Sequence, residues 1–391
     1  MNLFDVYPLF DIEPVKAKGA WLWDNEGKKY LDFYGGHAVI SIGHSHPHYI
    51  KKLEEQLEKI AFYSNSVKIK QQEELAQKLG ELSGYENYHL FLCNSGAEAN
   101  ENALKLASFQ NGRKKIIAFE KSFHGRTSLA VAATNDKSIQ APVNAAHEII
   151  FVPLNDTEAF KKAIDKNTCA VIVEGIQGVA GIQVPDDEFL KLIQQECTNT
   201  GALMVLDEVQ SGYGRTGDFF AHQRSSRSLR GTKQSLQPDI ITTAKGMGNG
   251  FPIAGVLINP SIPAKHGQLG TTFGGNYLAC AAGIAVLDVI KQENLMENAA
   301  IIGKYITGKL GGVEGIKEIR GTGLMLGIEL EFNSTQVRND LVFKQSIFTG
   351  SASNKNTIRL LPPLTITKEE ADFFLEGFGA VLKSHLKAIA Q

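Results

Sequence analysis

The chain has 391 residues, with 40 Lys and Arg against 42 Asp and Glu, so its formal charge is −2. This balance excludes a generally basic nucleic-acid-binding protein and an acidic, solvating chain. Apolar residues make up 43% and charged residues 21%, which excludes wholesale disorder and leaves enough apolar material for a large core.

The N-terminal fifty residues predict a small β-structure. The opening MNLFDVYPLFDIEP has early acids and no basic stretch, so we expect no signal peptide. The segment WLWDNEGKKYLDF predicts a hairpin that turns at residues 25–27. His44, His46 and His48 alternate, but Pro47 interrupts them and no acid or cysteine is close in sequence. We therefore expect a turn here and no metal site.

The middle of the chain alternates short apolar runs with helical patterns, such as the stripe of Leu75, Leu79 and Leu82. Strands that alternate with helices predict an α/β domain with a mostly parallel sheet. The runs expected as buried strands are His89–Cys93, Lys115–Phe119, Glu148–Val152, Ala170–Val173, Ala202–Leu206, Ile240–Ala244 and Ile253–Ile258.

The last hundred residues mix strand-like runs such as Leu324–Leu330 with a final helix, which begins with a capping box from Thr367 to Glu370. We predict that residues 1–50 and 288–391 form one smaller α+β domain beside a large α/β domain of residues 51–287. The basic segment 223–237 contains no acid and no aromatic residue. We interpret it as a solvated surface loop and not as a phosphate- or nucleic-acid-binding patch.

The four cysteines lie far apart in the sequence, which favours a reducing cytoplasm over a disulfide framework. The longest uncharged stretch, His266 to Leu287, is interrupted by glycines and does not predict a membrane span. We therefore expect a cytoplasmic protein without membrane or nucleic-acid partners.

Polar residues follow several of the predicted strands, where ligands bind in open α/β sheets. The turn Ser95-Gly96-Ala97 follows one strand and opens a helix, which is consistent either with a phosphate site or with an ordinary helix cap. Asp207 follows another strand and is expected to be partly buried, and Glu174 follows a third. Lys245 ends a fourth, and a lysine in a desolvated pocket becomes an amine nucleophile.

One small molecule accounts for these features together. Pyridoxal phosphate requires a lysine for its aldehyde, an acid for its ring nitrogen, an anion nest for its phosphate and apolar side chains against its ring. Lys245, Asp207 and Ser95-Gly96-Ala97 supply the first three, and Phe123 and Val209 supply the last. No GxGxxG follows a strand and no GxxxxGK[ST] is present, which argues against a nicotinamide or P-loop site.

Over nearly its whole length, the chain resembles the fold-type I pyridoxal-phosphate aminotransferases of class III. The context of FHGRT and TTFGGN most resembles the acetylornithine aminotransferases and their succinylornithine counterparts, and the former act in arginine biosynthesis. The motifs that carry the resemblance are GGHAVISIGHSHP (35–47), NSGAEANENALKLA (94–107), FHGRT (123–127), DEVQSGYGRTG (207–217), PDIITTAKGMGNGFPIAG (238–255), TTFGGN (271–276) and IRLLPPLTIT (358–367).

The resemblance implies roles at the cofactor. Lys245 would bind the cofactor covalently and later move a proton, and Asp207 would keep the ring nitrogen protonated. Phe123 and Val209 would enclose the ring, and Gln210 would bond its hydroxyl. The phosphate would be bound by Ser95, Gly96 and Ala97 together with the partner subunit's Thr272, which makes the expected assembly a homodimer.

The resemblance also implies a substrate site. Arg126 and Thr271 would hold the acylated end of an amino donor, Arg359 would bind a carboxylate of 2-oxoglutarate or glutamate, and Glu174 would lie beside the substrate. Residues 173–181 read VEGIQGVAG, with Val179 where relatives often have a glutamate that pairs with the carboxylate-binding arginine. Without that glutamate, the positive charge of Arg359 is expected to be less neutralised by the chain itself. This argues against free ornithine as the donor.

The expected reaction converts N-acetylornithine and 2-oxoglutarate into N-acetylglutamate 5-semialdehyde and glutamate. N-succinylornithine is the close alternative because Arg126 does not by itself distinguish an acetyl from a succinyl group. Ornithine and 4-aminobutyrate are further candidate donors. A catalytically silent binding protein of the same fold is the non-enzyme alternative.

Overall fold

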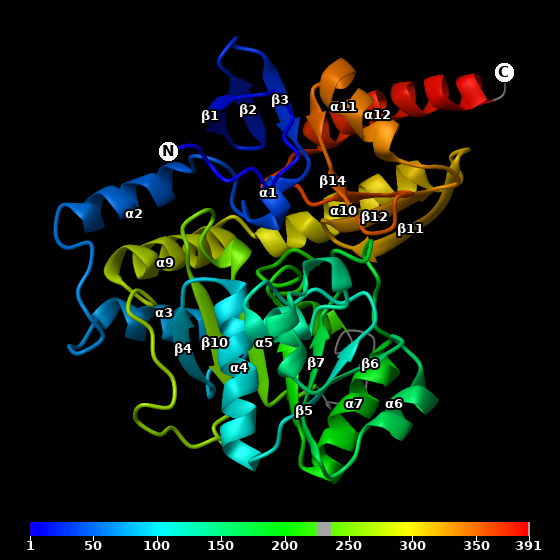
Figure 1. Cartoon of the computed structure of the whole chain (residues 1–391). Helices are drawn as coiled ribbons and strands as arrows, with labels where there is room; N and C mark the ends of the chain where they lie inside the picture. The colour runs from blue at the N-terminus through cyan, green and yellow to red at the C-terminus, as the bar shows by residue number, and fades with distance from the viewer. Residues whose placement is uncertain (225–235, 390–391) are drawn as a thin grey trace.

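The computed structural model describes residues 1–224 and 236–389. Its lower part in Figure 1 is a large sheet with helices on both sides, and its upper part holds two smaller sheets with their own helices. The strand order of the large sheet is β4-β10-β9-β8-β7-β5-β6. Its strands are β4 (His89–Cys93), β5 (Lys115–Phe119), β6 (Ile149–Val152), β7 (Thr168–Glu174), β8 (Leu203–Asp207), β9 (Ile240–Thr243) and β10 (Ala254–Ile258).

All seven apolar runs form strands, and the predicted α/β class is confirmed. Every residue of β7 and β8 is buried, as expected for strands covered on both faces. The strand β6 lies at the sheet edge, and only its last residue is buried.

One strand differs in direction from the predicted pattern. β10 pairs antiparallel with both β4 and β9, whereas the pairs among β5 to β9 are parallel. Only a short segment without a crossover helix joins β9 to β10, and a parallel neighbour would require a longer crossover. The connection therefore folds back beside β9, and Lys245 lies at its start.

The helices around the large sheet begin and end at recognisable signals. Ser95 caps α4 by accepting a hydrogen bond from the Glu98 backbone N–H at 3.2 Å, and Gly112 ends this helix in a left-handed conformation. α9 is apolar over most of its surface because it packs against α3 and against α2 (Pro47–Leu57). The helices are α3 (Lys70–Ser83), α4 (Gly96–Asn111), α5 (Ser128–Ala132), α6 (Thr157–Ala163), α7 (Asp187–Thr200) and α9 (Tyr277–Gln292).

The upper part combines both ends of the chain. β13 (Ile347–Phe348) pairs in parallel with β3, so a C-terminal strand completes the N-terminal sheet β1-β2-β3-β13. The second sheet has the order β11-β12-β15-β14. The remaining strands are β1 (Pro14–Lys18), β2 (Trp21–Asp24), β3 (Lys29–Asp32), β11 (Ile316–Thr322), β12 (Met325–Leu330), β14 (Gly350–Ser351) and β15 (Thr357–Leu360).

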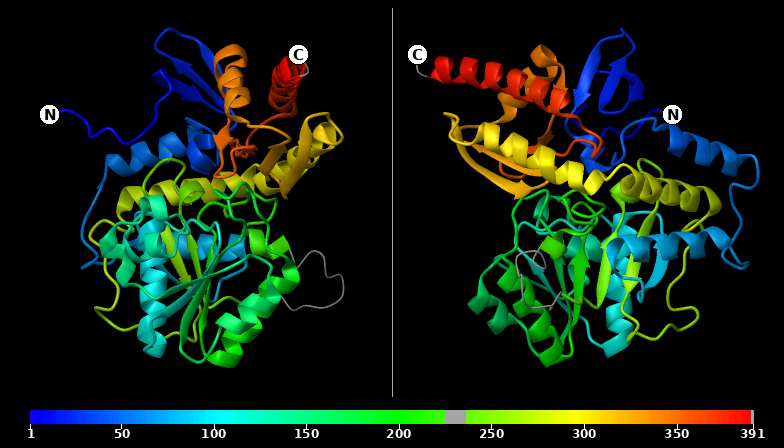
Figure 2. Two further views of the ribbon diagram at one scale, coloured as in Figure 1. Left: turned by 45° about the vertical axis from the view of Figure 1, so that its right-hand side comes forward. Right: turned by 180° about the vertical axis from the view of Figure 1, so that it is seen from behind.

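The predicted hairpin is confirmed as the antiparallel pair β2 and β3. The predicted capping box is confirmed too, since Thr367 and Glu370 exchange hydrogen bonds of 2.9 and 3.2 Å. In both views of Figure 2 the final helix lies on the upper side, away from the large sheet. The domain boundaries at residues 50 and 288 stay predictions. The helices of this part are α1 (Gly35–Ala38), α2 (Pro47–Leu57), α10 (Leu295–Leu310), α11 (Thr335–Gln345) and α12 (Lys368–Ile389).

Asn249 joins the N-terminal segment to the connection between β9 and β10. Its Oδ1 accepts hydrogen bonds from the backbone N–H groups of Ser41 and Ile42 at 2.8 and 3.1 Å, and its Nδ2 donates to the Gly43 carbonyl at 3.0 Å. The Ser41 hydroxyl donates to the Gly246 carbonyl at 2.7 Å. These contacts fix residues 41–43 against the loop that begins with Lys245.

The three alternating histidines each contact a different acid, which the sequence did not predict. His44 pairs with Asp32 at 2.8 Å; the partners of His46 and His48 are Glu293 and Asp288. Within residues 1–224 and 236–389 no group of three or more His, Cys, Asp or Glu side chains is arranged to hold a metal ion. In the same ranges no helix is long and apolar enough to cross a membrane. Most of the basic segment 223–237 lies outside the described residues.

Candidate active site

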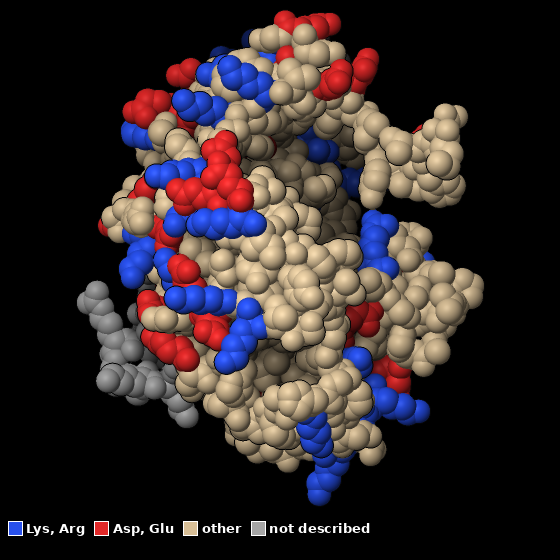
Figure 3. Space-filling model, turned by 90° about the vertical axis from the view of Figure 1, so that its left-hand side faces the viewer, with Lys and Arg blue, Asp and Glu red and all other residues tan. Residues whose placement is uncertain are grey.

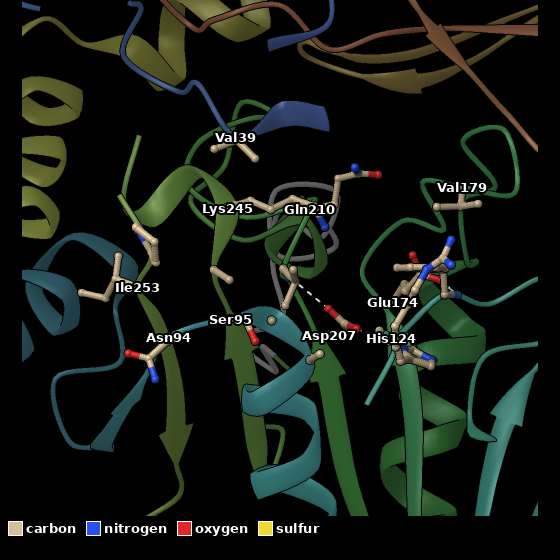
Figure 4. Close-up of a pocket in the computed structure, with 18 of the residues that line it drawn as sticks. Val39, Asn94, Ser95, His124, Glu174, Val179, Asp207, Gln210, Lys245 and Ile253 are labelled. Carbon is tan, nitrogen blue, oxygen red and sulfur yellow. Dashed lines mark hydrogen bonds and ion pairs between the residues drawn. The ribbon is translucent and has the colours of Figure 1, made fainter. Parts of the chain in front are cut away.

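A cavity of 440 Å³ lies at the carboxyl ends of the central strands, below the N-terminal segment. Figure 4 shows that Lys245 lies above Asp207 within it. Three predicted site residues, Thr271, Thr272 and Arg359, are not among those that line it. The predicted residues that do line it are Ser95, Gly96, Ala97, Phe123, Arg126, Glu174, Asp207, Val209, Gln210 and Lys245.

Lys245 begins the turn η4 (Lys245–Met247) directly after β9, with a positive φ of 43°. Burial lowers the pKa of its ammonium, and the Arg359 charge acts in the same direction, while Asp207 and Glu174 oppose both. A lower pKa increases the fraction of neutral amine, which is the form that attacks an aldehyde.

Asp207 ends β8 and is held by three donors. Its Oδ2 accepts hydrogen bonds from Asn100 Nδ2 at 2.8 Å and from His124 Nδ1 at 2.7 Å, and its Oδ1 accepts one from the Val209 N–H at 3.0 Å. Asn100 is itself fixed, because it donates to the His124 carbonyl and accepts from the Thr242 hydroxyl, both at 2.7 Å. The carboxylate is therefore held in one orientation.

Sequence reasoning did not assign His124 and Asn100 to the site. His124 stands in FHGRT beside the assigned Phe123, and this motif was the only available signal for it. Asn100 lies one helical turn after Gly96 on the inner face of α4 and is 1% exposed. A polar residue on an apolar helix face signals a buried partner, but the sequence does not show which one.

The start of α4 provides a site for an anion. The helix begins at Gly96, so the first backbone N–H groups of the helix point into the cavity. A Cβ at Gly96 would lie 2.6 Å from Val209 Cγ1. Only glycine therefore allows the start of the helix to lie this close to Val209. The glycine thus brings the helix terminus against the residue predicted to cover a cofactor ring.

Glu174 joins the two loops on the opposite side of the cavity. Its two oxygens accept hydrogen bonds from the backbone N–H groups of Phe123 at 3.0 Å and Gly178 at 3.2 Å. Burial raises its carboxyl pKa to about 7, partly opposed by the charge of His124. The predicted substrate contact of Glu174 stays a prediction; its contacts in the chain position Phe123.

Gln210 contacts the predicted carboxylate-binding arginine. Its Nε2 donates to the His37 carbonyl at 3.1 Å, and its Oε1 accepts from Arg359 Nη1 at 3.3 Å. A Cβ at position 178 would lie 1.7 Å from this Oε1 atom, so the orientation of the Gln210 side chain requires glycine there. The bond from Gln210 to a cofactor hydroxyl stays a prediction.

Arg126 is exposed at the cavity wall, and no ion pair or hydrogen bond of its side chain occurs with the described residues. Thr271 lies farther out, where its Oγ1 accepts hydrogen bonds from Asn94 Nδ2 at 3.3 Å and from the Gly274 N–H at 3.1 Å. Thr272 is exposed. The predicted roles of these three residues stay predictions.

A family profile described as aminotransferase class-III matches residues 5–382. The chain belongs to this family. It is therefore a pyridoxal-phosphate-dependent aminotransferase with the fold-type I architecture, as the sequence motifs predicted, and its substrates are small molecules.

Similar proteins agree with this assignment. The acetylornithine aminotransferase of Archaeoglobus fulgidus is 40% identical over 96% of each chain, and that of Methanosarcina acetivorans is 39% identical over 91% of this chain and 88% of its own. The crystal structure of Toxoplasma gondii ornithine aminotransferase has a TM-score of 0.89 at 29% identity, covering 97% of this chain and 92% of its own. The acetylornithine aminotransferase from Elizabethkingia anophelis has a TM-score of 0.81 at 32% identity, covering 97% and 95%.

The cavity of this class-III aminotransferase fits pyridoxal phosphate. Burial lowers the pKa of Lys245, three donors orient the Asp207 carboxylate, and the glycine-initiated start of α4 suits a phosphate. When bound, the cofactor supplies an electron sink that stabilises negative charge at the substrate carbon. The chain contributes an amine at Lys245 Nζ, a fixed negative charge at Asp207 and a cavity that positions both.

Proposed function

We propose that this aminotransferase transfers the side-chain amino group of N-acetylornithine to 2-oxoglutarate, giving N-acetylglutamate 5-semialdehyde and glutamate, as a step of arginine biosynthesis. The observation that carries the proposal is that Lys245, Asp207 and Arg126 line one cavity, while a second guanidinium, that of Arg359, contacts the cavity-lining Gln210. Two separate guanidinium groups suit an acceptor with carboxylates at both ends, which 2-oxoglutarate has. The names of the similar proteins support the same donor.

In this proposal Lys245 is the group that carries protons. Burial keeps part of its amine neutral, so its Nζ would take a proton from the substrate carbon that bears the amino group and would deliver it to the carbon on the other side of that nitrogen. Asp207 would accept a hydrogen bond from the cofactor ring nitrogen and so hold that nitrogen protonated. Arg126 and Thr271 hold the donor's acylated end, Arg359 binds a carboxylate of 2-oxoglutarate, and Gln210 bonds the ring hydroxyl.

The proposed assembly is a homodimer in which the partner subunit's Thr272 completes the phosphate site. α2 and the segment after it lie at the left of Figure 1, the side that faces the viewer in Figure 3, where broad areas lack charged atoms. This segment exposes Leu57, Tyr63 and Val67, and the rings of Phe62 and Phe273 lie 5.3 Å apart beside Thr272. Such a contiguous apolar surface is typical of an interface between subunits.

The dimer is tested by sedimentation velocity. Replacing Phe273, which is 60% exposed, by Asp places a charge on this face and is expected to shift the protein to monomers with weaker cofactor binding. An unchanged dimer would contradict the assignment of this face.

We also infer a cytoplasmic location. All four cysteines are free and buried, which fits a reducing compartment.

A donor panel tests the proposed reaction. Initial rates are compared for N-acetylornithine, N-succinylornithine, ornithine and 4-aminobutyrate at equal concentration, with 2-oxoglutarate as the acceptor. We expect N-acetylornithine to react fastest and ornithine slowly; a faster reaction of any other donor would reject the proposed substrate. Absence of any half-reaction with glutamate would favour the silent binding protein.

A further inference from the structure

Arg359 is a buried cation whose hydrogen-bond acceptors are all neutral. It lies on β15 and is 4% exposed. Its Nη1 and Nη2 donate to Gln210 Oε1 and to the Tyr34 hydroxyl, each at 3.3 Å, and its Nε donates to the Ser351 carbonyl. No carboxylate of the described chain lies within 4 Å of it. Glu174 acts on it only from a distance, and that carboxyl has a pKa of about 7.

Arg338, on α11, is a second cation with a neutral acceptor, and it is partly buried. Its Nη2 donates to the Thr349 carbonyl at 3.0 Å, and its Nε is buried without a partner. Asp340 lies two residues away on the same helix but is engaged by Lys344 at 2.7 Å and His385 at 3.2 Å. Arg338 therefore also lacks an ion pair among residues 1–224 and 236–389.

The chain brings both arginines close enough to Tyr34 that each of their charges acts on its phenol. Thr349, which accepts from Arg338, is followed by Gly350, and Gly350 lies opposite Arg359 in the pairing of β14 with β15. A Cβ at Gly350 would lie 2.3 Å from a Tyr34 ring carbon, so the glycine allows the ring to lie against this strand. The Arg359 guanidinium carbon is 5.8 Å from the centre of that ring.

Electrostatics agrees with this arrangement. Burial lowers the pKa of both guanidinium groups, and the Arg359 charge lowers that of Arg338 further. Burial raises the pKa of the Tyr34 phenol, so the phenol stays neutral and supplies no counter-charge. Cations buried without acids are unfavourable unless a ligand brings the missing negative charge.

We propose that Arg338 is a specificity-determining residue of this aminotransferase: together with Arg359 beside Tyr34, it creates the positive potential that selects a dicarboxylate. The inference rests on the proposed function in that 2-oxoglutarate or glutamate is the physiological dicarboxylate. Arg359 binds the carboxylate directly, and Arg338 acts through its charge without touching the substrate. Arg338 strengthens binding of the acceptor and leaves the amino donor unaffected.

Calorimetry on the cofactor-loaded enzyme tests the proposal with glutarate, a dicarboxylate that cannot react. Arg338→Gln is expected to raise the Kd for glutarate about three- to tenfold near 20 mM salt and less than about twofold near 500 mM, because salt screens a charge that acts at a distance. Arg338→Lys keeps the charge and is expected to restore most of the affinity. The KM for 2-oxoglutarate should rise by the same factor, with kcat and the donor KM unchanged.

Lys344→Gln is the matched control, because it removes one positive charge from the same helix at a site already paired with Asp340. It is expected to leave the glutarate Kd unchanged. Equal Kd values for Arg338→Gln and the parent, an effect that does not depend on salt, or an equal effect of Lys344→Gln would each overturn the proposal. Arg338→Met is the second neutral variant, so that a folding defect of one neutral variant leaves the other to decide.

The failure of this inference is separable from failure of the proposed function. Glutarate binding requires no turnover, so an Arg338-dependent Kd with an inactive donor panel would reject only the proposed reaction. An active donor panel with an Arg338-independent Kd would reject only the role of Arg338.

Discussion

Replacing Glu174 by Gln tests the electrostatics of the cavity through the stability of the cofactor-free protein. Burial raises the pKa of this carboxyl from its ordinary 4.5 to about 7. A raised pKa means that folding favours the protonated form, so the full stability exists below pH 4.5 and is lost as the pH rises through 7. At about 1.4 kcal/mol per pKa unit, ionised Glu174 costs the folded state at most about 3 kcal/mol above pH 7.

Gln at position 174 has no such pH dependence, but its amide can accept only one of the two backbone N–H bonds, a loss of about 1 kcal/mol. The free energy of unfolding of the variant, relative to the parent, should therefore rise by about 2 kcal/mol between about pH 5.5 and 8.5. Urea denaturation followed by circular dichroism at both pH values measures this difference. The exposed Glu158→Gln is the control for loss of an acid. A difference that does not change with pH would refute the assigned pKa.

Three further variants test the other parts of the site. Lys245→Ala should abolish transamination. After borohydride treatment, peptide mass mapping should find no cofactor attached to the variant chain, whereas the parent should carry it at Lys245. Asn100→Ala removes three hydrogen bonds, one of them to a charged group, and should lower the free energy of unfolding by about 3 kcal/mol in urea; a loss below about 1 kcal/mol would contradict the described network. Gly96→Ala places a Cβ 2.6 Å from Val209 Cγ1 and should raise the Kd for pyridoxal phosphate by about tenfold, measured by fluorescence titration. Gly308→Ala, where the added atom meets open space, should leave that Kd unchanged.

The sequence predicted the parts of the site that are local in the chain. Asp207, Lys245 and the turn at Ser95 each follow a short apolar run, and strand ends of one sheet meet at one edge. The runs needed no tertiary information because buried strands are recognisable from composition alone. Arg126 and Arg359 stand out in no such pattern, and only the family motifs indicated them.

The features that the sequence did not predict depend on long-range contacts. The antiparallel direction of β10 could not be predicted, because an apolar run has the same composition in either direction. Asn100 meets Asp207 across 107 positions of the chain, and Arg338 meets the surroundings of Tyr34 from a helix near the C-terminus. No local pattern specifies such pairs.

The three hydrogen bonds of the Asn249 side chain have a consequence for how the enzyme can move. They tie residues 41–43, which follow the helix above the cavity, to the loop that carries Lys245. A displacement of that N-terminal segment on substrate entry must either break these bonds or shift the nucleophilic amine with it. The N-terminal segment above the active site and the Lys245 amine are therefore expected to move together.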